Sequence, residues 1–167
     1  MQISRKIIII LLPIFIILGI FSCKKEQNPS TYIINENDLY PPGAEKTKLK
    51  TSEQWVSILH TNLFQTALSG SEIFEISQVI QSTGDKQLTR EVIISNFMNK
   101  QGVIMPSKEE MNNDLNTFIT QTYQRFLVRN PTKAELAYFT AYITANPNVD
   151  PELIYFSFAL SNEYLYY

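Results

Sequence analysis

The stretch from residue 123 to residue 164 constrains the fold most, because helix-forming sequence alternates there with residues that end and begin helices. The Asn130-Pro131 pair ends one helix, since the residue before a proline avoids the helical region. Thr132-Lys133-Ala134-Glu135 is then a capping box, in which the first and last side chains bond to each other's backbone amides. Asp150-Pro151 places a cap before a proline at the first helical position. The stretch therefore predicts helices joined by short turns.

The same kinds of signal occur in the preceding sequence. Thr51 caps a first helix that we expect to end near Ser69-Gly70, where glycine accepts the left-handed conformation. Ser71 opens a second predicted helix, and Thr89 caps a third. Ser107-Lys108-Glu109-Glu110 is a capping box that begins a long helix ending at the Asn-Pro pair. Together these signals predict an all-α fold of about six helices.

The helical part of the chain contains an internal repeat. Three pairs of segments have similar sequences at a separation of about 60 residues. The pairs are EIFEISQVIQ (72–81) with ELAYFTAYIT (135–144), EVIISNFMN (91–99) with ELIYFSFAL (152–160), and LFQTAL (63–68) with TYQRFL (122–127). The repeat predicts two similar three-helix halves, residues 51–100 and 107–167. Chance similarity between amphipathic helices is the alternative.

The N-terminus has the composition of an export signal. Arg5 and Lys6 precede an apolar run from Ile7 to Phe21. This run of about 15 residues is shorter than the roughly 20 that a membrane-spanning helix needs. Residues 1–22 are therefore predicted to be a cleaved signal peptide. An uncleaved N-terminal anchor is the alternative.

The end of this signal, Ile20-Phe21-Ser22-Cys23, resembles the lipobox of bacterial lipoproteins. The resemblance implies that Cys23 becomes the first residue of the mature protein and carries the lipid, palmitate included. Lys24 rather than aspartate follows it, which by analogy indicates the outer membrane of the cell envelope. The Cys-Lys-Lys-Glu start also resembles lipoproteins of the Bacteroidetes group. The periplasmic and the surface-exposed leaflet both remain open.

Cys23 is the only cysteine, so a disulfide within one mature chain, a CxxCH haem site and a cysteine-based zinc site are excluded. The predicted signal contains 2 of the 14 basic residues and none of the 16 acidic ones, so the mature chain carries a net charge of −4. No basic patch is present, and we therefore expect no nucleic-acid partner.

Residues 23–50 are predicted to be a flexible linker, because they are polar and proline-containing and show neither helical nor strand periodicity. Packing of their few apolar residues on the domain surface is the alternative. The remaining 51–167 have the length of one domain.

Two segments of the second half resemble phycobilisome-linker-like helical domains of bacterial secreted and envelope proteins. They are FLVRNPTKAELA (126–137) and the closing SNEY (161–164). The resemblance implies a helical fold that serves as a linker or as an accessory module of larger extracellular proteins. The residues that match the family pattern are Arg129, Pro131, Glu135, Ser161, Glu163 and Tyr164.

Arg129 is the charged residue with two competing interpretations. It can form an ion pair with Glu163 or bind a backbone carbonyl near the C-terminus, or it can belong to an anion or partner site. Aromatic residues crowd the end of the chain, from Tyr138 to Tyr167. Those of the last helix cannot all face one core, and aromatic residues are favoured at protein interfaces. The candidate interaction residues are Arg129, Tyr155, Phe156, Tyr164, Tyr166 and Tyr167. Packing of the aromatic rings against the other half is the alternative.

No metal or cofactor site is predicted. His60 is the only histidine and has no set of partner ligands at helical spacing, which favours a surface or boundary position. Glu109, Glu110 and Asp114 lie at a helix start, where acidic side chains stabilise the positive end of the helix dipole. Calcium binding is the alternative for this acidic group.

No nucleophile, base and orienting group occur together, so we predict that the protein is not an enzyme. We predict a non-catalytic, membrane-anchored lipoprotein that acts as a helical protein-interaction module in an envelope complex. The alternative is a small-ligand-binding protein or an accessory subunit of an envelope enzyme. That alternative places the ligand between the two halves, in an apolar cavity of roughly a few hundred Å³.

Overall fold

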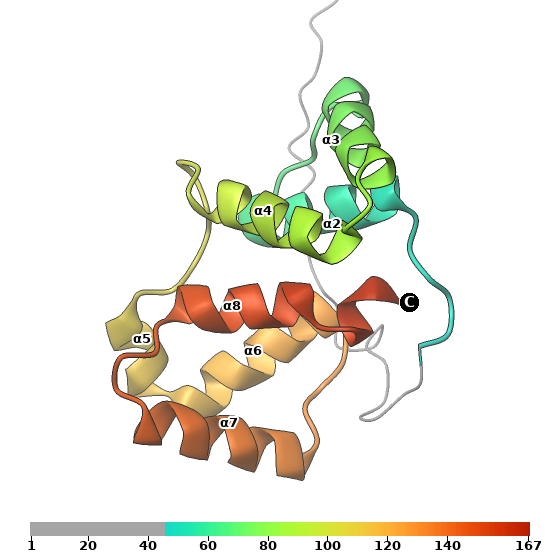
Figure 1. Cartoon of the computed structure of the whole chain (residues 1–167). Helices are drawn as coiled ribbons and strands as arrows, with labels where there is room; N and C mark the ends of the chain where they lie inside the picture. Colours follow the sequence, from blue (N-terminus) through green and yellow to red (C-terminus); the bar gives the residue numbers. More distant parts are fainter. Residues whose placement is uncertain (1–45) are drawn as a thin grey trace, which may run out of the picture.

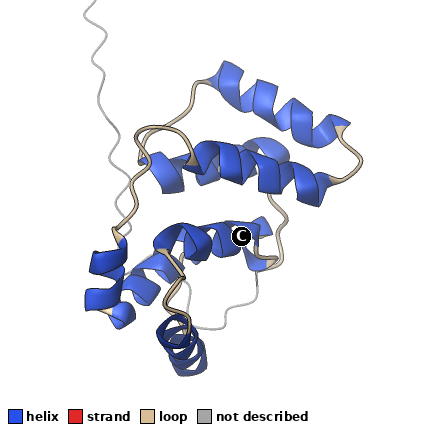
Figure 2. Ribbon diagram, turned by 60° about the vertical axis from the view of Figure 1, so that its left-hand side comes forward, coloured by secondary structure: helices blue, strands red, loops and turns tan. Residues whose placement is uncertain are grey.

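A computed structural model describes residues 46–167, and all of the regular structure in this part is helical (Figures 1 and 2). It confirms the predicted all-α class. Seven α-helices and one short 3₁₀ helix follow each other: α2 (Ser52–Phe64), α3 (Gly70–Ser82), α4 (Lys86–Met98), α5 (Lys108–Asn113), α6 (Leu115–Leu127), α7 (Lys133–Ala145), α8 (Pro151–Leu160) and η2 (Glu163–Leu165). None of these helices is both long and apolar enough to cross a bilayer. The predicted signal peptide, Cys23 and most of the predicted linker lie outside the described residues.

Local backbone chemistry moves three predicted helix boundaries in the first half. α2 ends at Phe64 rather than near Gly70, because Gln65 takes the left-handed conformation with φ 53°. Ser69 rather than Ser71 caps α3. Asp85 rather than Thr89 caps α4, and its carboxylate accepts a hydrogen bond from the amide of Leu88.

The long helix predicted after Ser107 is two helices in the structure. The predicted capping box of Ser107 and Glu110 is present and begins α5. Asp114 then leaves the helical conformation, with φ −148° and ψ 85°, and its side chain caps α6 by accepting from the amide of Thr117. A residue that satisfies the first amides of a new helix can separate two helices without a loop.

The two halves have equivalent helix ends, which confirms the predicted internal similarity. Thr51 and Asp114 cap the first helices, and Ser69 and Thr132 cap the second ones, each at an offset of about 63 residues. The residues that end the first helices, Gln65 and Val128, are the only described non-glycine residues with positive φ, both at 53°.

These equivalences correct one of the three segment alignments. The equivalent helix ends pair Leu63 with Phe126, and both side chains are buried. The alignment of LFQTAL with TYQRFL pairs Leu63 with Thr122 instead. That alignment is therefore wrong by four residues, about one helical turn.

The third helices, α4 and α8, share their buried positions. An offset of about 61 residues pairs every buried apolar residue of α4 with a buried residue of α8. The pairs are Ile93 with Ile154, Ile94 with Tyr155, Phe97 with Phe158 and Met98 with Ala159. α4 begins about one turn earlier than α8 relative to these pairs.

The halves meet through these equivalent helices, since α4 packs against α8 (Figure 1). A buried hydrogen bond of 2.9 Å from the Asn62 side chain to the Tyr164 hydroxyl also joins the halves. The apolar core is continuous across this contact.

The last residues of the predicted linker belong to the folded unit. The Lys50 amide donates to the Leu165 carbonyl at 2.9 Å, and the Tyr167 amide donates to the Lys48 carbonyl at 2.8 Å. Leu49 forms an isolated antiparallel bridge with Tyr166 between these bonds. Residues 48–50 are therefore held to the C-terminal residues by backbone hydrogen bonds.

Val128 offers a test of the helix ends. A β-branched residue in the left-handed conformation is strained by about 1–2 kcal/mol, and glycine is not. We expect Val128→Gly to raise the free energy of unfolding by about 1 kcal/mol, measured by urea denaturation. Val92→Gly, in the middle of α4, is the control and should lower it by about 1 kcal/mol. A lower stability for Val128→Gly would contradict the assigned conformation.

Candidate functional site: a buried ion cluster and two apolar grooves

The Arg129 side chain is the centre of a buried ion cluster. Arg129 follows the left-handed Val128, so the chain turns sharply at the end of α6, and the arginine is only 4% exposed. Glu135 lies in the first turn of α7 and Glu163 begins η2. The cluster thus joins three elements that are distant in the sequence.

The guanidinium group of Arg129 uses all of its donors. It has five N–H groups, and the structure assigns it five hydrogen bonds. Nε and Nη2 donate to Glu163 at 2.7 and 2.8 Å, Nη1 and Nη2 donate to Glu135 at 2.9 and 2.7 Å, and Nη1 also donates to the Asn130 carbonyl at 3.2 Å. Both carboxylates are bound in the bidentate manner that suits arginine. No donor remains for a ligand.

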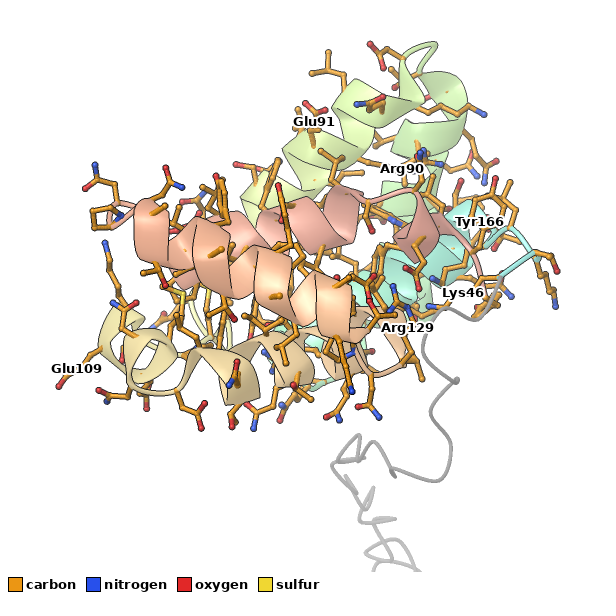
Figure 3. The ribbon with its side chains drawn as sticks, turned by 90° about the horizontal axis from the view of Figure 1, so that it is seen from below. Lys46, Arg90, Glu91, Glu109, Arg129 and Tyr166 are labelled. Carbon is orange, nitrogen blue, oxygen red and sulfur yellow. The ribbon has the colours of Figure 1, made fainter. Side chains whose placement is uncertain are left out.

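A second cation completes the cluster. The Lys46 ammonium lies 3.4 Å from a Glu163 oxygen and donates to the Leu127 carbonyl, and its side chain is 4% exposed. The Arg129 guanidinium also lies 4.8 Å from the centre of the Tyr123 ring. Two cations and two carboxylates leave the cluster without net charge. Figure 3 shows Lys46 beside Arg129 at the point where the chain enters the fold.

The pKa values follow from these contacts. Hydrogen bonds from Arg129 lower the pKa of Glu135 from 4.5 to about 2. Burial raises the pKa of Glu163, but the hydrogen bonds and charges of Arg129 and Lys46 outweigh it and lower the pKa overall. Burial, with a smaller effect of the Lys46 charge, lowers the pKa of Lys50 to about 8. The two carboxylates are thus held in their charged forms.

The structure supports the first interpretation of Arg129, an ion pair with a structural role, over an anion or partner site. The predicted pairing with Glu163 is present, and Glu135 adds a second partner. The sequence predicts Glu135 as a helix cap and as a residue of the family pattern, but not as a partner of Arg129. The spacing of Arg129 and Glu135 across the Asn-Pro-Thr turn could have predicted this pair. The capping box holds the Glu135 side chain next to the residues that precede α7.

Burial removes three of the predicted interaction residues from the surface. Arg129, Tyr155 and Tyr164 are 4%, 4% and 0% exposed. The Tyr155 hydroxyl accepts from Arg125 at 2.9 Å. The remaining three, Phe156, Tyr166 and Tyr167, are half-buried.

The exposed large apolar side chains of the second half lie on α7 and α8. Tyr138 and Tyr142 of α7 and Leu153 of α8 are 64%, 39% and 48% exposed. They border a groove of about 330 Å³ between α7 and α8, together with Phe139, Ile154 and Ser157. Sequence reasoning placed Tyr138 and Tyr142 in an aromatic-rich region but selected the last helix instead. The two tyrosines are four residues apart and so share one face of α7, which was the missed signal.

The first half has the equivalent groove. It lies between α3 and α4 and has a volume of about 560 Å³. Val79 and Val92, each 52% exposed, occupy the positions of Tyr142 and Leu153. The other lining residues are Ile76, Thr89, Ile93, Asn96, Phe97, Asn99 and Lys100.

The residues considered for metal binding have structural contacts. Nδ1 of His60 lies 2.9 Å from the Thr66 carbonyl oxygen, and its ring stacks on Phe64. Glu110 completes the capping box of Ser107 at the start of α5, and Asp114 caps α6. Within residues 46–167, no three potential ligands from histidine, cysteine, aspartate and glutamate gather in one place.

Comparisons with known proteins find no relative for this chain. No protein-family profile matches it. No curated protein matches it significantly, and neither does any solved structure. The resemblances to lipoproteins and to phycobilisome-linker-like domains therefore stay predictions.

The ion cluster predicts both a stability loss and a pH dependence. Arg129→Ala should lower the free energy of unfolding by about 3 kcal/mol, because two partly buried carboxylates lose their cation. The pKa of Glu135 is about 2 in the folded protein against 4.5 in an unfolded chain, so the unfolded state binds more protons between these values. Stability should therefore fall as the pH is lowered from about 5 to 2, and less steeply in Glu135→Gln.

Urea titrations at a series of pH values measure both effects. Lys133→Ala, on the exposed side of α7, is the matched control and should behave like the wild type. An Arg129→Ala protein of wild-type stability, or an unchanged acid dependence in Glu135→Gln, would rule out this role of the cluster.

Proposed function

We propose that this protein is a non-catalytic lipoprotein, in which a lipid on Cys23 anchors a helical protein-interaction module to the cell envelope, at the outer membrane. The partner is an envelope protein, and the contact surface is the α7–α8 groove with Tyr138, Tyr142 and Leu153. We call these three residues the tyrosine surface.

The exposure of the tyrosine surface is the observation that carries the proposal. Large apolar side chains that lie together on a surface mark interaction sites more often than scattered ones do. Tyrosine is well suited to a contact, because it buries a large area and keeps a polar hydroxyl. The rings of Tyr138 and Tyr142 are stacked, with centroids 6.3 Å apart and planes inclined by 12°. The surface is therefore partly ordered before a partner binds.

The path of the chain supports an anchored module. The segment that comes from Cys23 enters at Lys46, whose ammonium is bound inside the ion cluster. A force applied through the lipid would therefore act on the folded unit at the Arg129 cluster and at the C-terminal residues. α7 contributes Glu135 to the cluster, but Tyr138, Tyr142 and Leu153 make none of the hydrogen bonds or ion pairs of the cluster in the described part of the chain.

Small-ligand binding is the second candidate function. The α3–α4 groove favours it, because its volume of about 560 Å³ lies in the range of ligand sites. The groove lies within the first half, whereas sequence reasoning placed a ligand between the halves.

The anchor is tested by metabolic labelling with palmitate in the native cells. Wild-type protein should incorporate the label and sediment with membranes. Cys23→Ser should lose the label, because the thiol that carries the lipid is missing, while a Ser22→Ala variant should keep it. Labelling of Cys23→Ser, or no labelling of the wild type, would contradict the proposed anchor.

The partner surface is tested by in-cell crosslinking, purification in detergent and mass spectrometry. The double variant Tyr138→Ser, Tyr142→Ser should lose at least about tenfold of the crosslinked partner, since truncating a tyrosine that is a hot spot of a contact costs about 2 kcal/mol or more. Tyr167→Ser is the matched control and should keep it. Equal recovery with the double variant, or no specific partner with the wild type, would count against the proposal.

A further inference from the structure

The α3–α4 groove is an apolar depression with one polar end. The buried side chains of Ile93 and Phe97 lie beneath it, and Val79 and Val92 border it with about half of their surface exposed. Lys100, just beyond the end of α4, also lines it. Burial of this apolar surface by an occupant favours binding by about 25 cal/mol for each Å² removed from water.

The internal repeat supplies a comparison for the size of the occupant. Ile76 and Val79 in the α3–α4 groove stand at the positions of Phe139 and Tyr142 in the α7–α8 groove. The same helical framework thus holds two aromatic rings in the second half and two smaller aliphatic side chains in the first. The groove volumes agree with this difference, at about 560 Å³ against 330 Å³. The larger volume of the α3–α4 groove therefore corresponds to the two aromatic rings that the first half lacks.

The charge at the end of the groove indicates the second property of the occupant. Among the described residues, no carboxylate lies within ion-pair distance of the Lys100 ammonium, which instead lies 5.2 Å from the centre of the Phe97 ring. Hydrogen bonds from Ser69 in the α3 cap, with a smaller effect of the Lys100 charge, lower the pKa of Glu72, and its carboxylate stays bound to the amide and hydroxyl of Ser69. The equivalent residue of the second half is Ser161, so the α7–α8 groove has no such cation. An anionic group at Lys100 would complement its charge.

We infer that the α3–α4 groove binds a small anionic amphiphile, with an aromatic body between α3 and α4 and a carboxylate or sulfonate at Lys100. The body lies on Val79 and Val92 and fills the volume that Phe139 and Tyr142 fill in the other half. Asn96 also lines the groove, and its side chain carries an amide that can donate to an anionic group. This inference depends neither on the lipid anchor nor on the tyrosine surface.

The probe for the test is 2-naphthoate, with the neutral 2-naphthalenemethanol as its matched control. The full-length lipidated protein in detergent micelles is labelled at valine methyl groups and titrated with each probe. Protein-free micelles correct for partitioning of the probe. The methyl signals of Val79 and Val92 should shift saturably with 2-naphthoate. An exposed ion pair contributes up to about 1 kcal/mol, so naphthoate should bind about three- to fivefold more tightly than the alcohol.

Two variants separate the apolar contact from the charge. Val79→Tyr introduces the residue that the second half has at this position, and it should abolish the saturable shift at Val92. Lys100→Gln should keep binding of the alcohol and remove the preference for naphthoate. Ser157→Ala, in the α7–α8 groove, should change neither. Unchanged thermal midpoints show that the variants are folded.

Three results would overturn the inference. They are the absence of a saturable shift at Val79 and Val92, equal affinity of the wild type for the acid and the alcohol, and undiminished binding by folded Val79→Tyr. Protection of the groove by a protein partner, seen as crosslinks at α3 and α4 in cells, would also count against a small ligand. The proposed partner at the tyrosine surface would be unaffected by any of the first three.

Discussion

The Arg129 guanidinium makes five hydrogen bonds to two carboxylates and a carbonyl, and much of the second half is positioned by them. Glu135 fixes the start of α7, and Glu163 fixes the C-terminal turn. Glu163 also holds Lys46, where the chain enters the fold. Each group alone would be costly to bury, but the set is neutral and its hydrogen bonds are satisfied. Arg129 therefore links the first described residues of the fold, at Lys46, to its C-terminal turn through Glu163.

The repeat shows how two similar halves acquire different properties. The halves share the ends of their first helices, the capping boxes of their second helices and the buried apolar positions of their third helices. At the position equivalent to Arg129 the first half has Thr66, and at that of Tyr123 it has His60. The second half thus keeps the ion cluster and aromatic rings in its groove, and the first half keeps an open groove beside a lysine. Different surfaces on one framework are consistent with a module that makes more than one contact.

The candidate site was less predictable than the fold, for two physical reasons. In a helix that is apolar on all sides, the sequence does not show which face is buried. Tyr155 and Tyr164 were therefore as plausible as Tyr138 for a partner surface. The grooves depend on how far neighbouring helices are held apart, which their side chains decide only after packing. Arg129 was singled out because it matches the family pattern beside a helix end, where an ion pair with Glu163 was one of its two interpretations.

The sequence by itself determined the helical class, most of the caps and the existence of the repeat, since capping residues act on amides only a few positions away. The predicted register of the first repeat pair was wrong by four residues, because a shift of about one turn presents the same face of a helix. Tertiary structure decided that register through Gln65 and Val128. It also decided the contact of α4 with α8, the second carboxylate on Arg129 and the fastening of Lys46–Lys50 to the C-terminus. These contacts join residues that are far apart in the chain, so only the packed fold brings them together.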